Sequence, residues 1–370
     1  MKIQFWFFLW FPLLVSCLNN AKKKTDTDTS LPFFDGVDLS YLNEMEDCGA
    51  QFKNLKNEVQ DPYEIFGQAG AEIVRVRLWN NPKWTNYSNL EDVKKTILRS
   101  KAFGMKVLLD FHFSDTWADP SKQIIPEEWR TYADDDAELG NILYKYTKSV
   151  LRELIEENLK PELVQIGNEI NTMILQKEEG HQENIDWKRN SYLINKAITA
   201  VRDVDPEIEI MLHIAQPENA LWWFKEAEEN GISDYEWIGL SYYPKWSSIK
   251  LEEVDLPIQT LITTYNKKLM VVETAYPFTL ENADSANNIL GEDALISGFP
   301  ASVEGQYQFL VTLKNKIQTA GGQGLIYWEP AWVSTKCTTL WGTGSHWDNA
   351  SLFDFNHKAL KSLLFMNPSF

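Results

Sequence analysis

The sequence predicts an α/β fold in which eight parallel strands alternate with helices and close into a single (β/α)8 TIM barrel. Short apolar or β-branched runs alternate with amphipathic helical stretches along most of the 370 residues. The apolar runs are nearly hydrophobic throughout, which is typical of parallel strands buried on both faces. An open doubly wound sheet shares this alternation, but no glycine-rich phosphate loop follows the first run. A closed barrel is therefore favoured.

The expected elements follow one another from Phe34 onward. Strands are expected at Phe34–Leu39, Ile73–Trp79, Lys106–His112, Leu163–Glu169, Glu209–Ile214, Trp237–Tyr242, Leu269–Thr274 and Gly324–Trp328. Helices are expected at Leu90–Phe103, Ala137–Asn158, Asn184–Val204, Trp222–Asn230, Ile258–Lys267 and Val303–Thr319. Such a barrel takes roughly 250 residues and accepts long loop insertions, so one domain is the default.

The N-terminus has the features of an export signal. A charged start precedes an apolar run from Phe5 to Val15, which is too short to cross a bilayer and is followed by Ser16 and Cys17. This order resembles a bacterial lipoprotein signal, in which Cys17 becomes the acylated first residue of the mature chain. An ordinary signal peptide cleaved near the same place is the alternative.

The lipoprotein interpretation predicts three parts and a location. They are a signal peptide at 1–16, the lipidated Cys17 with a flexible linker over 17–31, and a (β/α)8 catalytic domain over 32–370. The linker is charged and Thr/Asp-rich, without apolar periodicity. The lipid anchor implies attachment to a membrane. The protein is expected as an exported lipoprotein at the bacterial outer membrane, on the cell surface or on the periplasmic face.

Two cysteines remain beyond Cys17. Cys48 and Cys337 follow the first and last expected strands, which are neighbours in a closed barrel. An exported protein can oxidise such a pair. A disulfide and two buried thiols both fit the sequence.

Charge and aromatic content restrict the partner. The net charge of −18 would repel phosphate backbones, which excludes nucleic acid. Fifteen Trp and fourteen Tyr suit stacking on the apolar faces of sugars, although many of them fill the core. A neutral polysaccharide fits this composition.

Two glutamates stand at the ends of otherwise apolar strands. Glu169 ends the fourth expected strand after Asn168, and Glu273 ends the seventh. These strand ends face each other across the mouth of a barrel, where the loops form the cleft. Retaining glycoside hydrolysis needs such a pair, one protonated and one ionised. For either glutamate alone, a structural ion pair is the alternative.

Longer motifs make the resemblance specific. They are Gly36–Ser40, Val74–Trp79, Asp110–Pro120, Gly167–Ile170, Glu273–Pro277 and Tyr327–Trp332. From about Phe34 to the C-terminus the chain resembles the arabinogalactan endo-β-1,4-galactanases of glycoside hydrolase family 53. The resemblance implies retaining endo-hydrolysis of β-1,4-galactan or type I arabinogalactan, with Glu169 as acid/base and Glu273 as nucleophile. It implies no cofactor for the chemistry.

Further residues are assigned to the substrate site. Asn168 is expected to bind the 2-hydroxyl of the attacked sugar. Arg77 rather than Arg75 is expected to keep Glu273 ionised, because Arg77 lies closer to the strand end. Tyr243 is a candidate donor to Glu273. His112 and His213 are candidate hydroxyl partners, and a polar and aromatic rim is expected from Asp110, Asp115, Trp117, Trp328 and Trp332.

The loop after the seventh strand carries oxygen-bearing side chains at alternating positions, a spacing that suits Ca²⁺. Bacterial members of the family join this loop to the one after strand eight through calcium. The matching residues are Asn282, Asp284, Asn288, Ser345 and Asp348. Ala286 replaces an expected ligand, and Asn282 replaces a carboxylate, so a solvated polar loop is the alternative.

Two rival functions remain at this point. Another retaining β-glycanase of the same clan, such as a mannanase or cellulase, shares the catalytic pair. A surface glycan-binding lipoprotein on an inactive barrel is the non-enzymatic alternative. The presence of both glutamates and Asn168 argues against that alternative.

Overall fold

The computed structural model describes residues 1–2, 4, 32–180 and 184–367. The chain divides into two units, Met1–Leu31 and Pro32–Phe370, and the second contains the fold. The predicted signal peptide, Cys17 and the linker lie outside the described residues. Among the described residues, none of the helices combines the length and apolar character needed to cross a bilayer.

Eight parallel strands form a closed barrel in chain order, with β8 paired to β1, which confirms the predicted architecture. The strands are β1 (Phe34–Asp38), β2 (Ile73–Leu78), β3 (Lys106–Phe111), β4 (Leu163–Ile166), β5 (Glu209–Ala215), β6 (Trp237–Ser241), β7 (Lys268–Glu273) and β8 (Gly324–Tyr327). Each pair of strands that follow one another in the chain is connected through a crossover, as a βα repeat requires.

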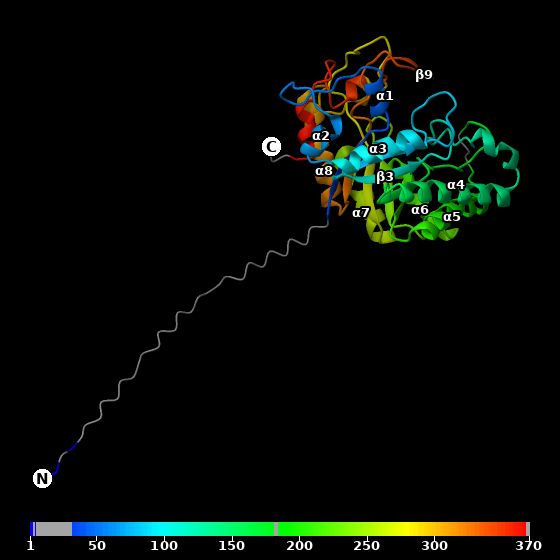
Figure 1. Cartoon of the computed structure of the whole chain (residues 1–370), viewed down its shortest axis with the longest axis horizontal. Coiled ribbons are helices and arrows are strands. Elements are labelled where there is room, and N and C mark those ends of the chain that lie inside the picture. The colour runs from blue at the N-terminus through cyan, green and yellow to red at the C-terminus, as the bar shows by residue number, and fades with distance from the viewer. Residues whose placement is uncertain (3, 5–31, 181–183, 368–370) are drawn as a thin grey trace. The chain divides into compact units, whose positions relative to one another are not determined.

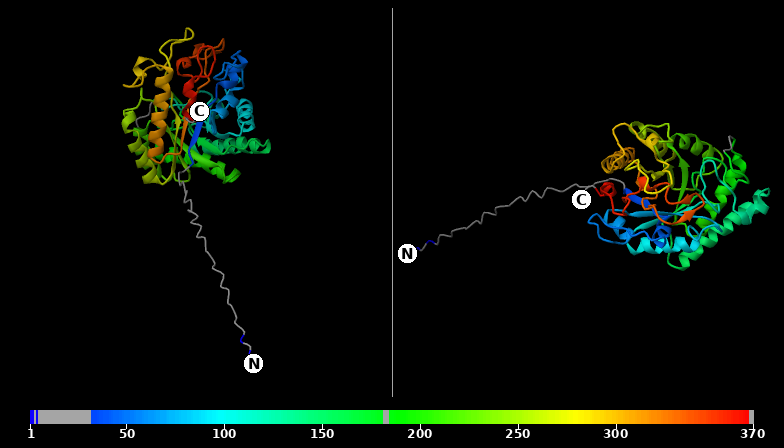
Figure 2. Two further views of the ribbon diagram at one scale, coloured as in Figure 1. Left: turned by 90° about the vertical axis from the view of Figure 1, so that its left-hand side faces the viewer. Right: turned by 90° about the horizontal axis from the view of Figure 1, so that it is seen from above.

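Helices surround the strands (Figures 1 and 2). They are α1 (Leu42–Asp47), α2 (Pro62–Gln68), α3 (Leu90–Ala102), α4 (Asp136–Glu156), α5 (Trp187–Val204), α6 (Pro217–Glu229), α7 (Asp255–Tyr265) and α8 (Val303–Thr319). The expected helix at Trp222–Asn230 begins five residues earlier, because Pro217 has the fixed φ that suits a first helical position.

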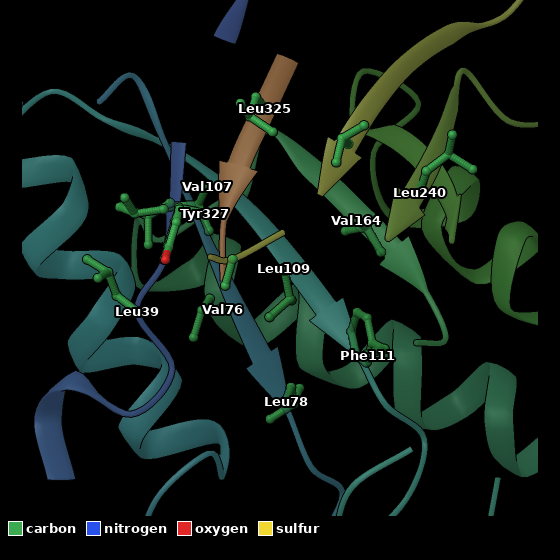
Figure 3. Packing of buried hydrophobic residues seen from close by; sticks show 14 of the residues in the cluster. Leu39, Val76, Leu78, Val107, Leu109, Phe111, Val164, Leu240, Leu325 and Tyr327 are labelled. Carbon is green, nitrogen blue, oxygen red and sulfur yellow. The ribbon is translucent and has the colours of Figure 1, made fainter. Parts of the chain in front are cut away.

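Side-chain alternation divides the strands between two environments. On β2 and β3, Val76, Val107, Leu109 and Phe111 belong to the large core between strands and helices, and Figure 3 shows them on adjacent strands. The intervening position Leu108 belongs to a separate small cluster with other side chains that fill the barrel interior, namely Ile73, Leu163, Met211, Trp237, Met270, Val272 and Ile326.

The barrel interior becomes polar toward the carboxyl ends of the strands. Arg75, Asp110, Gln165 and His213 are all buried there, and Glu273 ends β7 beside them. Unpaired charges would be costly at such burial, so these groups must bind one another. Their contacts place the site at the end of the barrel where the βα-loops lie.

Strand β4 is shorter than expected. The sequence predicts a strand through Glu169, but β4 ends at Ile166. Gly167 has a φ of 78°, and a Cβ added there would lie 2.4 Å from Ile170 Cγ2. The prediction missed this turn because, apart from Gln165, the run has the apolar residues of a buried strand up to Gly167. The turn sets the direction of the two residues that follow.

The loop after β8 contains a two-stranded hairpin, β9 (Thr338–Thr339) and β10 (Gly342–Thr343), which the sequence did not predict. A disulfide joins Cys337, just before this hairpin, to Cys48 at the end of α1, with the Cα atoms 5.7 Å apart. Of the two states that the sequence allowed for this pair, the structure has the bridge.

Candidate active site

A cavity of about 840 Å³ opens at the carboxyl ends of the strands, and both glutamates line it. Its lining comes from the loops after β3, β4, β5, β6, β7 and β8. The lining residues are Trp117, Ala118, Asp119, Pro120, Ser121, Asn168, Glu169, Ala215, Gln216, Asn219, Tyr243, Trp246, Glu273, Ile289, Trp328, Trp332, Trp341, His346 and Trp347. The barrel thus brings together two carboxylates that are far apart in sequence.

Glu169 projects into this cleft from the turn after β4. Its Oε1 accepts a hydrogen bond of 2.5 Å from Ser241 Oγ. Burial raises the pKa of Glu169 to about 7, the Ser241 hydrogen bond opposes that rise, and the charge of Asp119 adds to it. A carboxyl group with such a pKa can carry a proton at neutral pH, as a general acid must.

Glu273 accepts from stronger hydrogen-bond donors than Glu169 does. Arg75 Nη1 lies 2.8 Å from its Oε1, and the Tyr243 hydroxyl donates to its Oε2 at 3.3 Å, as the sequence predicted for Tyr243. Burial raises the pKa of Glu273, Arg75 opposes the rise, and Glu169 adds to it. Two carboxyl groups in one cleft disfavour double ionisation. Among the described residues a cation contacts Glu273 but not Glu169, so the shared proton belongs on Glu169.

The expected pairing of Arg77 with Glu273 is wrong, because Arg75 makes that contact. Arg75 also binds Asp38 and Asp110, each at 2.8 Å. Both arginines point into the barrel, as strand alternation requires. The long Arg75 side chain extends its guanidinium toward the end of the strand, where it reaches Glu273. The distance of each arginine from the strand end therefore did not identify the partner of Glu273.

Arg77 instead pairs with Glu329 at 2.7 Å, a buried carboxylate that the sequence reading did not assign. The Arg77 guanidinium lies over three rings, 4.1 Å from the centroid of Tyr41, 4.8 Å from Trp79 and 4.4 Å from Trp117. Trp117 lines the cleft, so Arg77 contacts the site through an aromatic wall. Burial raises the pKa of Glu329 to about 8, against the effect of Arg77.

Hydrogen bonds to both atoms of its side-chain amide hold Asn168 in place. Its Oδ1 accepts from Arg75 Nη2 at 2.6 Å and lies 2.9 Å from His213 Nδ1. Its Nδ2 donates to the Ala118 carbonyl at 2.8 Å. One N–H of this amide remains for a ligand in the cleft, which fits the binding role predicted from the sequence.

Three predicted contact residues lie beneath the cleft. Asp110 and His213 are fully buried, and His112 Nε2 lies 3.0 Å from Asp110 Oδ2. Burial lowers the pKa of His213, as do the nearby charges, so its imidazole is neutral. The prediction that these residues face the sugar is wrong, because the polar groups of the barrel interior already bind them.

Asp115 supports the loop after β3. Its two carboxylate oxygens accept from the amide nitrogens of Asn81 and Glu127, at 2.9 and 2.8 Å. The predicted rim position is therefore wrong for Asp115, because both oxygens bind the backbone of neighbouring loops.

The aromatic part of the predicted rim is present and larger than expected. Trp117, Trp328 and Trp332 line the cleft, as do three further tryptophans, Trp246, Trp341 and Trp347. Trp328 and Trp347 pack edge to face with centroids 4.7 Å apart. These three further tryptophans come from the loops after β6 and β8. Hydrophobic periodicity predicts strands and helices but not the positions of loop residues, so the sequence did not identify them.

The proposed calcium ligands form two hydrogen-bonded groups. Asn288 Nδ2 donates to Asn282 Oδ1 at 2.8 Å and to Asp348 Oδ1 at 2.7 Å. Asp284 accepts from Ser334 Oγ at 2.5 Å and from the Ser345 backbone N–H at 2.9 Å. Within the described residues, no group of three or more His, Cys, Asp or Glu is arranged to hold a metal ion.

Comparison with known proteins agrees with this geometry. A family model described as glycosyl hydrolase family 53 matches residues 34–366. An arabinogalactan endo-beta-1,4-galactanase of Cellvibrio japonicus (strain Ueda107) is 52% identical over 357 residues, which cover 95% of this chain and 94% of that protein.

Solved structures extend the agreement to the fold. The family 53 catalytic domain of Ignisphaera aggregans matches with a TM-score of 0.84 at 33% identity, covering 91% of this chain and 96% of that one. A fungal β-1,4-galactanase matches with a TM-score of 0.77 at 31% identity, covering 91% and 99%. A paired-glutamate cleft, the family model and these relatives lead to one conclusion: the chain belongs to glycosyl hydrolase family 53.

Proposed function

We propose that the protein is an arabinogalactan endo-β-1,4-galactanase that cleaves internal β-1,4-galactosidic linkages by a retaining double displacement. The observation that carries the mechanism is the contrast between the two glutamates in one cleft. Glu273 binds Arg75, whereas the one donor to the Glu169 carboxyl group among the described residues is the neutral Ser241 hydroxyl. The substrate class is supported by the Cellvibrio relative, whose name specifies galactanase activity.

In the first step, Glu169 gives its proton to the glycosidic oxygen while Glu273 attacks the anomeric carbon. The bond from that carbon to the leaving oxygen breaks, and a galactosyl-enzyme ester forms. Arg75 and Tyr243 hold the attacking carboxylate in position, and they stabilise its charge before attack.

In the second step, Glu169 accepts a proton from water, and the resulting hydroxide attacks the anomeric carbon and releases Glu273. The remaining N–H of Asn168 donates to the 2-hydroxyl oxygen of the attacked sugar. That hydrogen bond strengthens as positive charge develops at the neighbouring carbon. The fixed amide carries no reorganisation cost, because Arg75 and Ala118 already hold it.

The direct test is hydrolysis of a panel containing β-1,4-galactan, mannan and cellulose. We expect release of short oligosaccharides from galactan alone, whereas hydrolysis of mannan or cellulose instead would favour another glycanase. Glu169→Gln and Glu273→Gln are each expected to reduce galactan hydrolysis on the order of 10²-fold or more with the fold intact. Glu138→Gln, at an exposed helix position, is the matched control. Near-normal turnover in either active-site variant would contradict the assignment.

We further propose that the protein is exported and held at the membrane through an acylated Cys17. The Cys48–Cys337 disulfide supports export, since disulfides persist in oxidising compartments. Cys17→Ser should then release the protein from the membrane fraction or leave it unprocessed. Unchanged fractionation would contradict the anchor.

Calcium takes no part in the proposed chemistry, and the predicted ligands do not fit it as arranged. Calcium accepts six to eight oxygens, whereas in the part of the chain that the structure describes two side-chain oxygens, from Asn282 and Asp348, converge on the Asn288 amide nitrogen. The Asn288 amide nitrogen takes the position between them. We infer that hydrogen bonds join these two loops.

A further inference from the structure

The end of β5 and the start of α6 present two amide groups to the cleft that the proposed reaction does not use. Gln216 is 7% exposed, and its Oε1 accepts from the Tyr243 backbone N–H at 3.3 Å. Asn219 Nδ2 donates to the Ala215 carbonyl at 2.9 Å. Within residues 32–180 and 184–367, Gln216 Nε2 and Asn219 Oδ1 have no hydrogen-bond partner. The two N–H donors of Gln216 Nε2 and the carbonyl oxygen of Asn219 therefore remain on this wall.

The backbone holds Gln216 in an unfavourable conformation. Its φ of 64° and ψ of 134° are seldom adopted by residues with a Cβ. The Gln216 N–H donates to the Ser241 carbonyl at 3.0 Å, and its carbonyl accepts from the Asn219 N–H at 3.1 Å. Such strain persists where the surroundings determine the conformation, and it is concentrated at functional sites.

The position of this wall in the barrel indicates which part of the substrate it meets. Strand β5 lies between β4, which leads to Glu169, and β6, which leads to Tyr243. Glu169 protonates the oxygen of the leaving sugar, so that sugar lies beside Glu169 and the loops after β4, β5 and β6. Trp328 and Trp341 follow β8, which lies on the other side of β7 from β5 and β6 in the closed barrel.

We propose that Gln216 and Asn219, beside Trp246, form the subsite for the galactosyl residue that leaves with the protonated oxygen. This assignment rests on the proposed galactanase function. Adjacent sugar hydroxyls both donate and accept, so the free NH2 group of Gln216 and the free carbonyl oxygen of Asn219 complement them. Trp246 is 48% exposed and packs edge to face on Tyr243, which leaves a ring available for the apolar face of the sugar.

The test compares two substrates that differ only in the leaving group. Galacto-oligosaccharides place a sugar in this subsite, whereas 2,4-dinitrophenyl β-galactobioside places an aryl group there and needs no protonation. Gln216→Met and Asn219→Ala should each lower kcat/KM on the oligosaccharides about tenfold, the effect of one hydrogen bond. Both variants should retain the wild-type kcat/KM on the aryl glycoside.

Asn195→Ala is the matched control, since Asn195 Nδ2 also binds a loop carbonyl, that of Gly231, but on α5 away from the cleft. It should behave as wild type on both substrates. Asn219→Ala leaves the Gln216–Tyr243 hydrogen bond intact, so it carries the test should Gln216→Met unfold. Equal losses on both substrates, or no loss on either, would overturn this subsite. Failure of the wild-type protein to cleave galacto-oligosaccharides would instead overturn the proposed function.

Discussion

Glu169 and Glu273 are identical side chains with different neighbours. Arg75 and Tyr243 both donate to Glu273, so its carboxylate is stabilised where negative charge is needed for attack. Glu169 lies near Asp119 and has a single hydroxyl donor, Ser241, so its neutral form is favoured. Two carboxyl groups whose surroundings favour opposite protonation states can divide acid and nucleophile roles.

The Ser241 hydroxyl provides a test of how Glu169 titrates. Its pKa of about 7 lies above the ordinary glutamate value, so Glu169 is protonated below pH 7 and loses its proton above it. The kcat/KM on galacto-oligosaccharides should therefore fall on the alkaline side of pH 7. Ser241→Ala removes a donor that stabilises the carboxylate, so the alkaline limb should move to higher pH.

The pH profile of kcat/KM for each protein measures this shift. With 2,4-dinitrophenyl β-galactobioside the alkaline limb due to Glu169 should be absent, because this leaving group needs no proton. A limb that stays in place or moves to lower pH in Ser241→Ala would show that another group controls it.

At the level of elements, the turn after β4 decides where the acid residue points. Gly167 reaches a φ of 78°, Glu169 follows with a φ of 45°, and strand β4 has already ended at Ile166. Only glycine avoids both the steric cost of this φ and the contact with Ile170 Cγ2. The position of Glu169 therefore depends on one residue without a side chain.

Gly167→Ala should lower both the free energy of unfolding and kcat. The left-handed φ costs about 1–2 kcal/mol, and the clash with Ile170 adds about 1–3 kcal/mol. Gly104→Ala is the matched control, because Gly104 has a φ of 76° but nothing within 4 Å of an added Cβ. Denaturant unfolding and galactan kinetics measure the effects. Equal loss of stability in both variants, with kcat unchanged in Gly167→Ala, would contradict a positioning role for this turn.

The loops after β7 and β8 form a second element-level test. If Asn288 joins them by hydrogen bonds to Asn282 and Asp348, chelation should leave the melting temperature unchanged. A cation bound only by the native state would stabilise it by mass action, so its removal would lower the melting temperature. Differential scanning calorimetry with chelator, followed by excess calcium, measures this. A decrease that calcium reverses would mean that the loops bind the ion.

At the scale of the whole molecule, closure of the barrel brings β4 and β7 to one cleft. Retention requires the two carboxyl groups to be about 5–5.5 Å apart, whereas a separation of about 6.5–9.5 Å leaves room for water and gives inversion. Because the Glu273 carboxylate is proposed to attack carbon directly, the first product should have a β-configured reducing end. Proton NMR of the products before mutarotation measures this. An initial α-anomer would contradict the nucleophile role of Glu273.

The sequence by itself determined the barrel and its two central residues. Hydrophobic runs of strand length locate β1 to β8 within a few residues, because burial on both faces excludes polar side chains from parallel strands. Burying a carboxylate at the end of such a run costs free energy, so a glutamate at that position indicates a function. This argument identified Glu169 and Glu273. Tyr243, just after β6, was found by the same reasoning about strand ends.

Only the tertiary structure decided which partners the other side chains of the site contact and where they lie along the barrel axis. Alternation shows that Arg75 and Arg77 share a face but not which of them reaches Glu273, because that depends on strand stagger and side-chain length. The state of Cys48 and Cys337, and the positions of Gln216 and Trp246 on the cleft, depend on loops whose folding long-range contacts determine. Local sequence specifies which face a residue occupies, whereas packing between distant segments specifies what it touches.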